Sequence, residues 1–545
     1  MEILTAWQDW EQWADGNWSL FPLIIQSPKG KSGLPAAWSK AWELASPYSV
    51  VLESGKGGRY TYLGLRPVSV LEGKGEQAKA TDMSLATPRT QDSGAAAILE
   101  AADLHGKPLD VLQRWMKGFA SPRVEDSGLP PFQGGCVGFL SYDVVRSLET
   151  LPSLAQDDPG FPDYLFMRFE ELWIYDHQED MLYCTVHVPV TAADRADLSV
   201  LEAIYADSAQ RAANMLEQWR LICSAAAERE AYTQAERDSI VAAIEDSGDL
   251  SGEWPGMKSA FSPEHFQQAV LDVQEYIRQG DVFQVNLSLR QEAQLKSPPE
   301  DVYEWLRGLN PSPYMGLLRS PGFALSSASP ELLVKLHGDK VSARPIAGTR
   351  RRGGTPAEDA AMEAELCGSE KEIAEHIMLV DLERSDIGRV AAYGSVSVPE
   401  LLTVERYSHV MHLVSQVEGR IASGKDAYDV IAALFPGGTI TGAPKVRTME
   451  IIEELEPVRR GPYTGSLGWI DYNGNMELNI IIRTLAVKDG IGYIQTGAGI
   501  VIDSDPYREY RECHNKAKAV VKAVLCSELQ QEARATNGAK GGATL

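Results

Sequence analysis

Two pairs of glutamates with identical spacing are the residues in this chain best suited to chemistry. Glu372 and Glu375 form one Glu-x-x-Glu pair, and Glu509 and Glu512 form the other. In a helix, positions i and i+3 lie on one face, so each pair would present two carboxylates side by side. Two such faces brought together would offer the oxygen ligands that Mg²⁺ prefers. With 76 acidic residues in the chain, either pair alone is equally explained as a solvated helix face.

A glycine-rich run, residues 436–445 (PGGTITGAPK), precedes a predicted helix. Turns of this kind expose backbone N–H groups to anions. The run is not a nucleotide-binding P-loop, because Ala443 and Pro444 stand where that motif needs its lysine. It predicts an anion-binding turn for another ligand; the alternative is a plain loop with a helix N-cap. Residues 495–499 (QTGAG) are a second place where a ligand could approach the backbone closely.

Three single residues are further candidates. Arg483 lies in an apolar stretch that reads as a strand, where a guanidinium is costly unless it faces a carboxylate. Glu331 follows a strand-like run; a partly buried carboxyl there would stay protonated, as a general acid requires, or could simply begin a helix. His412 comes three residues after His409, with no metal-ligand pattern beside it, so an interior histidine with satisfied hydrogen bonds explains it equally.

The elements that must position these residues follow from hydrophobic periodicity. Residues 1–255 read as a region of mixed strands and helices, and 256–530 as a second region that carries the candidate site residues. Ser262-Pro263-Glu264 is a typical helix start. The expected helices of the second region are 263–279, 358–391, 425–434, 444–455 and 506–526. The tail, 531–545, is low in bulky residues and is predicted to be disordered.

Composition excludes several classes of function. The chain has 545 residues, 44% of them hydrophobic and 23% charged, which is ordinary for a globular enzyme. A net charge of -25 without a basic stripe argues against nucleic-acid binding. The six cysteines are scattered and read as reduced thiols. No apolar run is long enough to span a membrane, and the acidic N-terminus is no signal peptide. We therefore expect a cytoplasmic protein that binds neither nucleic acid nor membranes.

Taken together and in this order, the segments resemble the chorismate-utilising enzymes. That family includes anthranilate synthase component I, aminodeoxychorismate synthase component I, and isochorismate and salicylate synthases. The resemblance is strong over 262–526, and residues 51–54 (VLES) and 134–143 (GGCVGFLSYD) extend it to the two amidotransferase-linked members. It implies an α+β fold in which two large antiparallel sheets pack face to face, with helices outside and the site in the cleft.

The resemblance also implies a role for each matching residue. Glu375 and Glu512 would bind Mg²⁺, and Glu372 and Glu509 would hold metal-bound waters. Glu331 would be the general acid that protonates the departing C4 hydroxyl of chorismate. His412, and not His409, matches the active-site histidine of the family. The implied substrate contacts are Gly348, Thr349, Thr439, Tyr463, Arg483, Gly497, Ala498, Gly499 and Lys516, with Arg483 and Tyr463 anchoring the enolpyruvyl carboxylate.

One position separates members that use water from members that use ammonia. Isochorismate and salicylate synthases have a lysine that activates water where this chain has Gln284, in residues 283–288 (FQVNLS). A neutral glutamine cannot act as a general base, whereas ammonia needs no deprotonation. The chain also lacks a Gly-x-Cys-x-Gly elbow, so it has no glutaminase of its own. Ammonia would come from solution or from a separate glutamine amidotransferase subunit.

Residues 284–288, 435–442 and 461–469 resemble aminodeoxychorismate synthases, particularly those of Bacillus-type bacteria. We therefore expect amination of chorismate to 4-amino-4-deoxychorismate, on the route to p-aminobenzoate and folate. Two positions depart from that pattern. Ala347 stands where many of these enzymes have a lysine that attacks C2, and an alanine cannot form that adduct. Ser385 stands where asparagine is usual, and we expect only a small structural effect from it.

Two alternatives remain at this stage. Anthranilate synthases also have alanine at the position of Ala347, so the chain could instead form anthranilate and pyruvate in tryptophan synthesis. The other alternative is a non-catalytic subunit that senses a ligand. Leu52, Glu53 and Ser54 resemble the tryptophan pocket of the family, although an ordinary strand end explains them as well.

Overall fold

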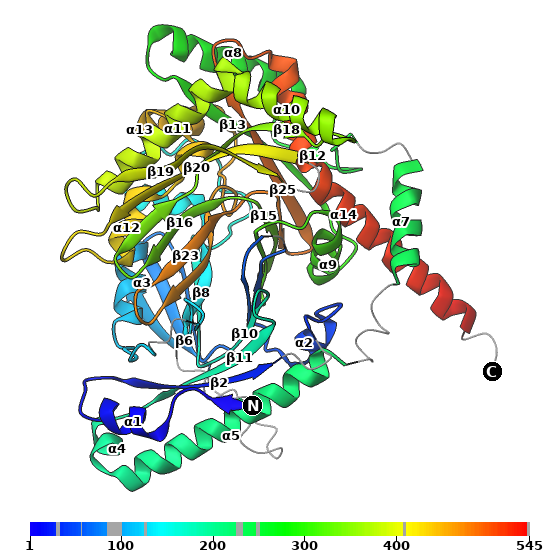
Figure 1. The fold of residues 1–545 in the computed structure, drawn as a ribbon. Helices are drawn as coiled ribbons and strands as arrows, with labels where there is room; N and C mark the ends of the chain where they lie inside the picture. Colours follow the sequence, from blue (N-terminus) through cyan, green and yellow to red (C-terminus); the bar gives the residue numbers. More distant parts are fainter. Residues whose placement is uncertain are drawn as a thin grey trace.

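The computed structural model describes residues 1–28, 33–55, 57–83, 101–124, 128–224, 233–246, 251–406 and 410–541. Its strands form two large antiparallel sheets, one of 13 strands and one of 12 strands. Helices cover the outer faces of both sheets (Figure 1). This is the α+β arrangement predicted above. Within the described ranges, no helix combines the length and the apolarity needed to cross a bilayer.

The first sheet joins strands from both ends of the chain. Its order is β1 (Glu2–Ile3), β2 (Leu20–Pro28), β11 (Met181–Pro189), β10 (Glu171–Asp176), β4 (Tyr60–Gly64), β3 (Ser49–Glu53), β14 (Tyr314–Arg319), β15 (Phe323–Ser329), β24 (Thr484–Lys488), β25 (Ile491–Ile500), β13 (Gln284–Gln294) and β12 (Lys258–Ser259), with β21 (Gly442–Ala443) also beside β13. The N-terminal and C-terminal regions meet where β3 pairs with β14.

The second sheet is assembled in the same interleaved way. Its order is β18 (Ile346–Arg351), β20 (Val410–Arg420), β17 (Lys340–Ala343), β16 (Leu332–His337), β23 (Met476–Ile480), β22 (Ser466–Asp471), β8 (Gly135–Leu140), β9 (Tyr164–Phe169), β5 (Ser69–Lys74), β6 (Gln77–Asp82) and β7 (Ala101–His105), with β19 (Ser397–Arg406) also beside β20. Here the two regions meet where β8 pairs with β22. The predicted boundary near residue 255 therefore separates two stretches of sequence, but each sheet contains strands from both stretches.

A hydrophobic core rich in aromatic residues joins the two sheets face to face. Phe139 of β8 meets Phe323 of β15 edge to face, with ring centroids 5.4 Å apart. Trp469 of β22 lies 6.1 Å from the ring of Tyr62 on β4 and stacks on Phe132 at 4.8 Å. Rings that alternate inward from both sheets are the usual way in which two antiparallel sheets bury a common core.

Helices bury the outer face of each sheet. On the first sheet, α5 (Leu198–Ile222) lies along β2 and β11, α9 (Pro299–Leu309) lies on β15, and α14 (Pro506–Gly541), the red helix of Figure 1, lies on β25. On the second sheet, α11 (Glu370–Gly388) packs against β20 and β18, and α3 (Pro108–Met116) and α12 (Ala427–Leu434) pack against each other over β5 and β16. Helices α11 and α14, which carry the glutamate pairs, therefore belong to different sheets.

Helix boundaries agree with the sequence where capping signals are strong. Helix α8 (Pro263–Gln279) is confirmed, and its N-cap Ser262 Oγ accepts from the His265 N–H at 3.2 Å. The single helix expected over 358–391 is instead α10 (Pro356–Gly368) and α11, because Ser369 interrupts the chain and caps α11. Helix α14 continues through Gly541, so most of the tail expected to be disordered is helical; 542–545 lie outside the described residues.

Candidate active site

Two turns that lie side by side hold the general-acid candidate and the arginine. Glu331 lies between β15 and β16, and Arg483 lies between β23 and β24. The Glu331 carbonyl accepts from the Ile480 N–H at 3.0 Å, and the Arg483 carbonyl accepts from the Ala328 N–H at 3.1 Å. These bonds join the turns directly. Glu331 does not begin a helix, which removes the structural alternative considered for it.

The Glu331 carboxyl is buried next to the cleft residues. Burial raises its pKa from 4.5 to about 7, and the Thr439 hydroxyl, Arg483 and Lys516 oppose that rise. Thr439 lies in the short helix η3 (Gly438–Ile440), and its Oγ1 is buried without a hydrogen bond of normal geometry to the described residues. At neutral pH, a substantial fraction of Glu331 is therefore protonated and can donate a proton.

Arg483 adopts a left-handed backbone conformation, with a φ of 50°, in the connection between the strands. Burial lowers the pKa of its guanidinium, and the nearby Glu331 partly offsets that effect. The sequence predicted a strand residue that faces a carboxylate. The structure differs, because the guanidinium forms no ion pair within 4.0 Å with any described residue. A largely buried guanidinium without an internal partner is suited to bind the carboxylate of a ligand.

Strand β25 brings the small residues 497–499 against β13. Gly499 is opposite Asn286, Ala498 is opposite Leu287, and Gly497 is opposite Ser288. A Cβ at Gly497 would lie 2.3 Å from Asn286 Oδ1 and 2.8 Å from the Tyr463 hydroxyl, and one at Gly499 would lie 2.4 Å from Gln284 Nε2. At Gly497 the Leu287 carbonyl also lies 3.0 Å from the Cβ position, so a side chain is disfavoured there, whereas at Gly499 a side chain would displace the Gln284 amide.

Tyr463 and Lys516 complete this wall of the site. Tyr463 is buried, and burial raises the pKa of its phenol, so the hydroxyl stays protonated and can donate to an anion. The ammonium of Lys516 donates to the Gly497 carbonyl at 2.8 Å. The structure thus brings Tyr463, Lys516 and the Gly497 backbone together.

The two glutamate pairs approach each other from α11 and α14. Burial raises the pKa of Glu375; Lys371 opposes the rise, while Glu372 and Glu512 add to it. Burial likewise raises the pKa of Glu509, again with a contribution from Glu512. The contribution of Glu512 to both shifts reflects repulsion between like charges, and a bound cation would relieve that repulsion.

Each pair is at present balanced by nearby basic side chains. The ion pairs are Glu372 with Arg350 at 3.0 Å, Glu375 with Lys371 at 3.8 Å, and Glu512 with Lys516 at 2.9 Å. In the part of the chain that the structure describes, no three acidic, histidine or cysteine side chains are gathered closely enough to hold a metal as they stand. The donors are nevertheless the carboxylates that Mg²⁺ prefers, so the residues fit this ion in chemistry once the basic side chains move away.

His412 lies beside the Gly348–Thr349 segment. Its Nδ1 is 3.0 Å from Thr349 Oγ1 and 3.2 Å from the Gly348 carbonyl, which can only accept. Burial lowers the pKa of the imidazole, so the ring is neutral with its proton on Nδ1. Gly348 has a φ of 69°, and a Cβ there would lie 3.0 Å from Glu372 Oε2. His409 lies outside the described residues.

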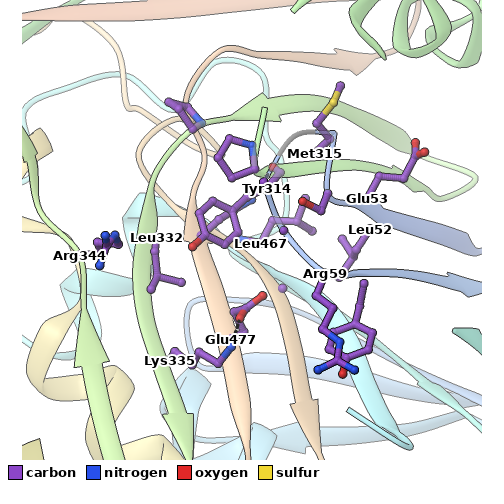
Figure 2. Close-up of a pocket in the computed structure, with 18 of the residues that line it drawn as sticks. Leu52, Glu53, Arg59, Tyr314, Met315, Leu332, Lys335, Arg344, Leu467 and Glu477 are labelled. Atoms are coloured by element: carbon purple, nitrogen blue, oxygen red, sulfur yellow. Dashed lines mark hydrogen bonds and ion pairs between the residues drawn. The ribbon is translucent and has the colours of Figure 1, made fainter. Parts of the chain in front are cut away.

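A cavity of about 630 Å³ between the sheets contains the residues proposed as an effector site (Figure 2). Leu52, Glu53 and Ser54 line it, as do Pro330 and Leu332, the neighbours of Glu331. The Ser54 hydroxyl is buried and has no hydrogen-bond partner among the described residues. The cavity therefore shares the turn that holds the general-acid candidate.

Glu53 is held by protein groups on its other side. Its carboxylate accepts from Trp38 Nε1 at 2.9 Å and from the Tyr303 hydroxyl at 2.6 Å, and it lies 3.0 Å from Arg307 Nε. Figure 2 shows the Glu53 side chain directed away from Leu332 and Arg344 on the opposite side of the cavity. The Glu53 carboxylate thus fixes the end of strand β3, and Leu52 and Ser54 are the neighbouring residues that can contact a ligand in the cavity.

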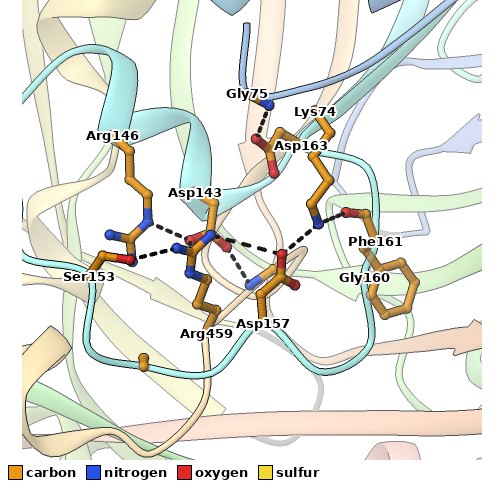
Figure 3. Close-up of polar contacts among 12 residues, drawn as sticks. Lys74, Gly75, Asp143, Arg146, Ser153, Asp157, Gly160, Phe161, Asp163 and Arg459 are labelled. Atoms are coloured by element: carbon orange, nitrogen blue, oxygen red, sulfur yellow. Dashed lines mark hydrogen bonds and ion pairs between the residues drawn. The ribbon is translucent and has the colours of Figure 1, made fainter. Parts of the chain in front are cut away.

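A polar network that sequence reasoning missed holds the segment before Tyr463. Figure 3 shows the Asp143, Arg459 and Asp157 side chains gathered in it. Asp143 accepts from the Gly461 N–H at 3.1 Å, and Arg459 donates to Ser153 Oγ at 3.0 Å. Lys74 pairs with Asp157 at 2.6 Å. These bonds hold the segment before Tyr463 against the N-terminal region. The Gly461–Asp143 and Arg459–Ser153 bonds join residues 318 and 306 positions apart, so no local sequence signal could have found them.

The family profile described as chorismate binding enzyme matches residues 50–522. Aminodeoxychorismate synthase component 1 of Bacillus subtilis is 44% identical over 491 residues, which are 89% of this chain and 94% of that protein. Anthranilate synthase component 1 of Thermus thermophilus is 45% identical over 419 residues, 77% of this chain and 83% of that protein.

A solved structure shows the same likeness in three dimensions. Anthranilate synthase component I from Streptococcus pneumoniae superposes with a TM-score of 0.66 at 32% identity, covering 85% of this chain and 92% of that one. The aminodeoxychorismate and anthranilate synthases thus match this chain to a similar degree. The similarity covers most of the chain, including strands of both antiparallel sheets. The chain therefore belongs to the family of chorismate-binding enzymes.

Proposed function

We propose that the protein aminates chorismate with ammonia to give 4-amino-4-deoxychorismate and water, in a reaction that depends on Mg²⁺. Ammonia would be supplied by a separate glutamine amidotransferase subunit. The observation that carries the proposal is the pairing of a carboxyl with a pKa of about 7, Glu331, with the unpaired guanidinium of Arg483 in the adjacent turn. This arrangement combines a proton donor with an anchor for a carboxylate.

The residues of the chain have separate tasks in this proposal. Arg483 and the Tyr463 hydroxyl bind the enolpyruvyl carboxylate, next to the Gly497 backbone that Lys516 holds. Glu331 donates its proton to the C4 hydroxyl, which leaves as water while the lone pair of ammonia forms the C–N bond. Glu331 then regains a proton from solvent. The neutral His412 orients the Gly348–Thr349 segment along the substrate.

The four glutamates are proposed as the Mg²⁺ site. Glu375 and Glu512 would hold the ion, with Glu372 and Glu509 around it. When bound, Mg²⁺ would supply positive charge for the ring carboxylate of chorismate. The carboxylates themselves would otherwise repel the dianionic substrate, so their present balance by Lys371, Arg350 and Lys516 indicates that this region requires compensating charge.

Amination at C4 is favoured by Asn286 in the QVNLS segment and by the length of the match to the Bacillus subtilis aminodeoxychorismate synthase. The second candidate is anthranilate synthesis, in which ammonia adds at C2 and pyruvate is eliminated. Ala347 favours it, because the aminodeoxychorismate synthases that work through a covalent adduct have a lysine at that position. With alanine there, ammonia must add directly in either case.

Product identification separates the candidates. The purified chain is incubated with chorismate, Mg²⁺ and an ammonium salt, with and without a lyase that releases p-aminobenzoate from 4-amino-4-deoxychorismate. We expect p-aminobenzoate only in the presence of the lyase. Fluorescent anthranilate and pyruvate without the lyase would establish the second candidate instead. Absence of turnover under both conditions would support a ligand-sensing role, for which tryptophan binding in the cavity at Leu52 and Ser54 is the corresponding assay.

A further inference from the structure

One buried ion pair joins three segments that carry candidate site residues. Arg460 and Glu456 lie in the segment that leads to Tyr463, and their side chains are only 1% and 3% exposed. Because both charges lose their water, a buried pair of this kind is not needed for stability as such. We propose that Arg460, held by Glu456, is a positioning residue that fixes the Tyr463 hydroxyl against the substrate wall formed by β13 and β25. The inference rests on the proposed role of Tyr463 as an anchor for the enolpyruvyl carboxylate.

The ion pair completes an edge of β13. On the side away from β25, β21 pairs with the start of β13 and β12 pairs with residues 291–292. Between these two pairings, none of the described strands lies along that edge. There the Asn286 carbonyl accepts from Arg460 Nη2 at 2.7 Å, and the Ser288 N–H donates to Glu456 Oε1 at 2.8 Å. The two charged side chains therefore satisfy backbone groups that a neighbouring strand would otherwise satisfy.

Every N–H group of the Arg460 guanidinium has an acceptor. Nε and Nη2 donate to the two carboxylate oxygens of Glu456, at 2.9 Å and 2.7 Å. The remaining N–H groups donate to the carbonyls of Asn286 and Ile440, at 2.7 Å and 2.9 Å, and to Thr464 Oγ1 at 3.4 Å. The planar fork is thus held in one orientation between β13, η3 and its own segment. A lysine could not make this set of bonds, because its three donors share one nitrogen.

Tyr463 is held by the same guanidinium. The Arg460 guanidinium carbon lies 5.6 Å from the centre of the Tyr463 ring, and the Tyr463 N–H donates to the Arg460 carbonyl at 3.1 Å. At the other end of the ring, the hydroxyl lies 2.8 Å from the position of a Cβ on Gly497. The ring therefore spans the distance from Arg460 to the β25 backbone. A hydroxyl that is already fixed in this way binds a carboxylate without a further loss of conformational entropy.

Glu456 connects the ion pair to β25 as well. Its Oε1 accepts from the Ser288 hydroxyl at 2.8 Å, and the same hydroxyl accepts from Gln495 Nε2 at 2.8 Å. Gln495 is two residues before Gly497 on β25. Both strands of the substrate wall are thus bonded, directly or through one hydroxyl, to the pair that holds Tyr463.

A double-mutant cycle with chorismate binding as its readout tests the inference. The dissociation constant for chorismate is measured by calorimetric titration with Mg²⁺ and without ammonium, so that amination cannot occur. Tyr463→Phe should raise it about tenfold, because one hydrogen bond to a charged group is lost. Arg460→Lys keeps the charge and loses the fork, and should raise it at least about fivefold in the wild-type background. In the Tyr463→Phe background the same change should have less than about a twofold effect, because the hydroxyl that Arg460 positions is absent.

Arg290→Lys is the matched control. Arg290 is a buried arginine on the same strand that pairs with Asp158 and Glu292, and its guanidinium carbon lies 5.3 Å from the centre of the Tyr493 ring. These partners lie outside the candidate site. The dissociation constant for chorismate should therefore stay within about twofold of the wild-type value in both backgrounds. Denaturant unfolding shows whether each variant is folded at the assay temperature.

The cycle has outcomes that overturn the inference. Equal effects of Arg460→Lys in the two backgrounds would show that Arg460 does not act through the Tyr463 hydroxyl, and an unchanged dissociation constant in Arg460→Lys would show that it does not act on binding at all. Wild-type binding by Tyr463→Phe would remove the proposed anchor and the inference with it. The cycle involves no amination, so an anthranilate product would overturn the proposed function and leave the inference standing.

A milder variant covers the case in which Arg460→Lys does not fold. Ser288→Ala removes the hydroxyl between Glu456 and Gln495 and leaves both charges of the ion pair in place. It should raise the dissociation constant for chorismate about two- to threefold in the wild-type background, and should have no measurable effect in the Tyr463→Phe background. Equal effects in the two backgrounds, or none in either, would overturn the inference.

Discussion

Lys516 lies 2.9 Å from Oε1 of Glu512, one helical turn away on α14, and also donates to the Gly497 carbonyl at 2.8 Å. One ammonium therefore connects a carboxylate proposed for the metal with the glycine strand proposed for the substrate. On α11, Lys371 forms an ion pair with Glu375 across the same spacing of four residues. Glu375 and Glu512 therefore each have a basic partner without a metal. Binding of Mg²⁺ would replace Lys371 and Lys516 as the partners of these two carboxylates.

The first prediction concerns the metal. Glu375→Gln should lower Mg²⁺-dependent turnover by about a hundredfold or more, because a neutral amide replaces a charged ligand. The wild-type midpoint of thermal unfolding should rise with added Mg²⁺, and that of the variant should rise much less. Glu370→Gln, an exposed change in the first turn of the same helix, is the control. Wild-type turnover and Mg²⁺ response in Glu375→Gln would remove this residue from the metal site.

The second prediction is the pH dependence of activity. Because Glu331 must be protonated to act, kcat at constant free ammonia should fall as pH rises through about 7. Glu331→Gln should abolish this dependence and lower kcat by about 10²- to 10⁴-fold. The profile is measured over about pH 5 to 9, roughly two units either side of that value. A flat profile in the wild-type chain would show that Glu331 is not the proton donor.

The same carboxyl should affect stability with a defined sign. Its pKa is raised from 4.5 to about 7 in the folded protein, so the folded state holds the proton more tightly than the unfolded state. The contribution of Glu331 is therefore fully present at low pH and is lost as pH rises through about 7, by about 3 kcal/mol at most. Denaturant unfolding of wild type and Glu331→Gln at pH 5 and pH 8 measures it. The wild type should lose more stability between the two pH values than the variant.

The third prediction concerns Arg483. Arg483→Lys keeps the charge but loses the planar fork, so the KM for chorismate should rise about tenfold or more. Arg483→Met should also raise the free energy of unfolding by about 1 kcal/mol or more, since a largely buried cation without a partner is removed. Arg384→Lys on the exposed face of α11 is the control. A loss of stability in Arg483→Met would mean that the guanidinium already has a partner within the protein.

The fourth prediction separates structure from regulation at Glu53. Glu53→Gln should destabilise the protein by about 1 to 3 kcal/mol, because it removes one of the two carboxylates that pair with Arg307 and leaves only Glu304 at 2.8 Å. Glu43→Gln breaks an exposed ion pair with Lys40 and should change the free energy of unfolding by less than about 1 kcal/mol. Chemical denaturation measures both. If Glu53→Gln keeps wild-type stability, Glu53 is free for a ligand in the cavity.

Features with a local cause could be predicted from the sequence. The start of α8 follows from Ser262 and Pro263, and the start of α13 (Lys445–Leu455) follows from the prolines and glycines before it. The break at Ser369 was missed because the sequence on both sides favours helix, and only the cap bond to the Glu372 N–H marks the interruption. Arg483 was misplaced for a related reason: its apolar neighbours read as strand, whereas its backbone adopts a left-handed turn.

Contacts between distant segments had no such local cause. The approach of Glu375 to Glu512 depends on how two sheets place α11 and α14, which periodicity does not determine. The spacing singled out both glutamate pairs, but only the family resemblance gave a reason for them to meet, and their roles remain predictions.

The interleaving of both sheets has a consequence for synthesis of the protein. When a ribosome has released residues 1–255, strands β3 and β8 have emerged, but their neighbours β14 and β22 have not. Two unfinished sheet edges are then exposed on the nascent chain, and such edges invite pairing with other molecules. Completion of either sheet must wait for nearly the whole polypeptide, so protection by chaperones is most needed late in translation, and a truncated chain would be prone to aggregate.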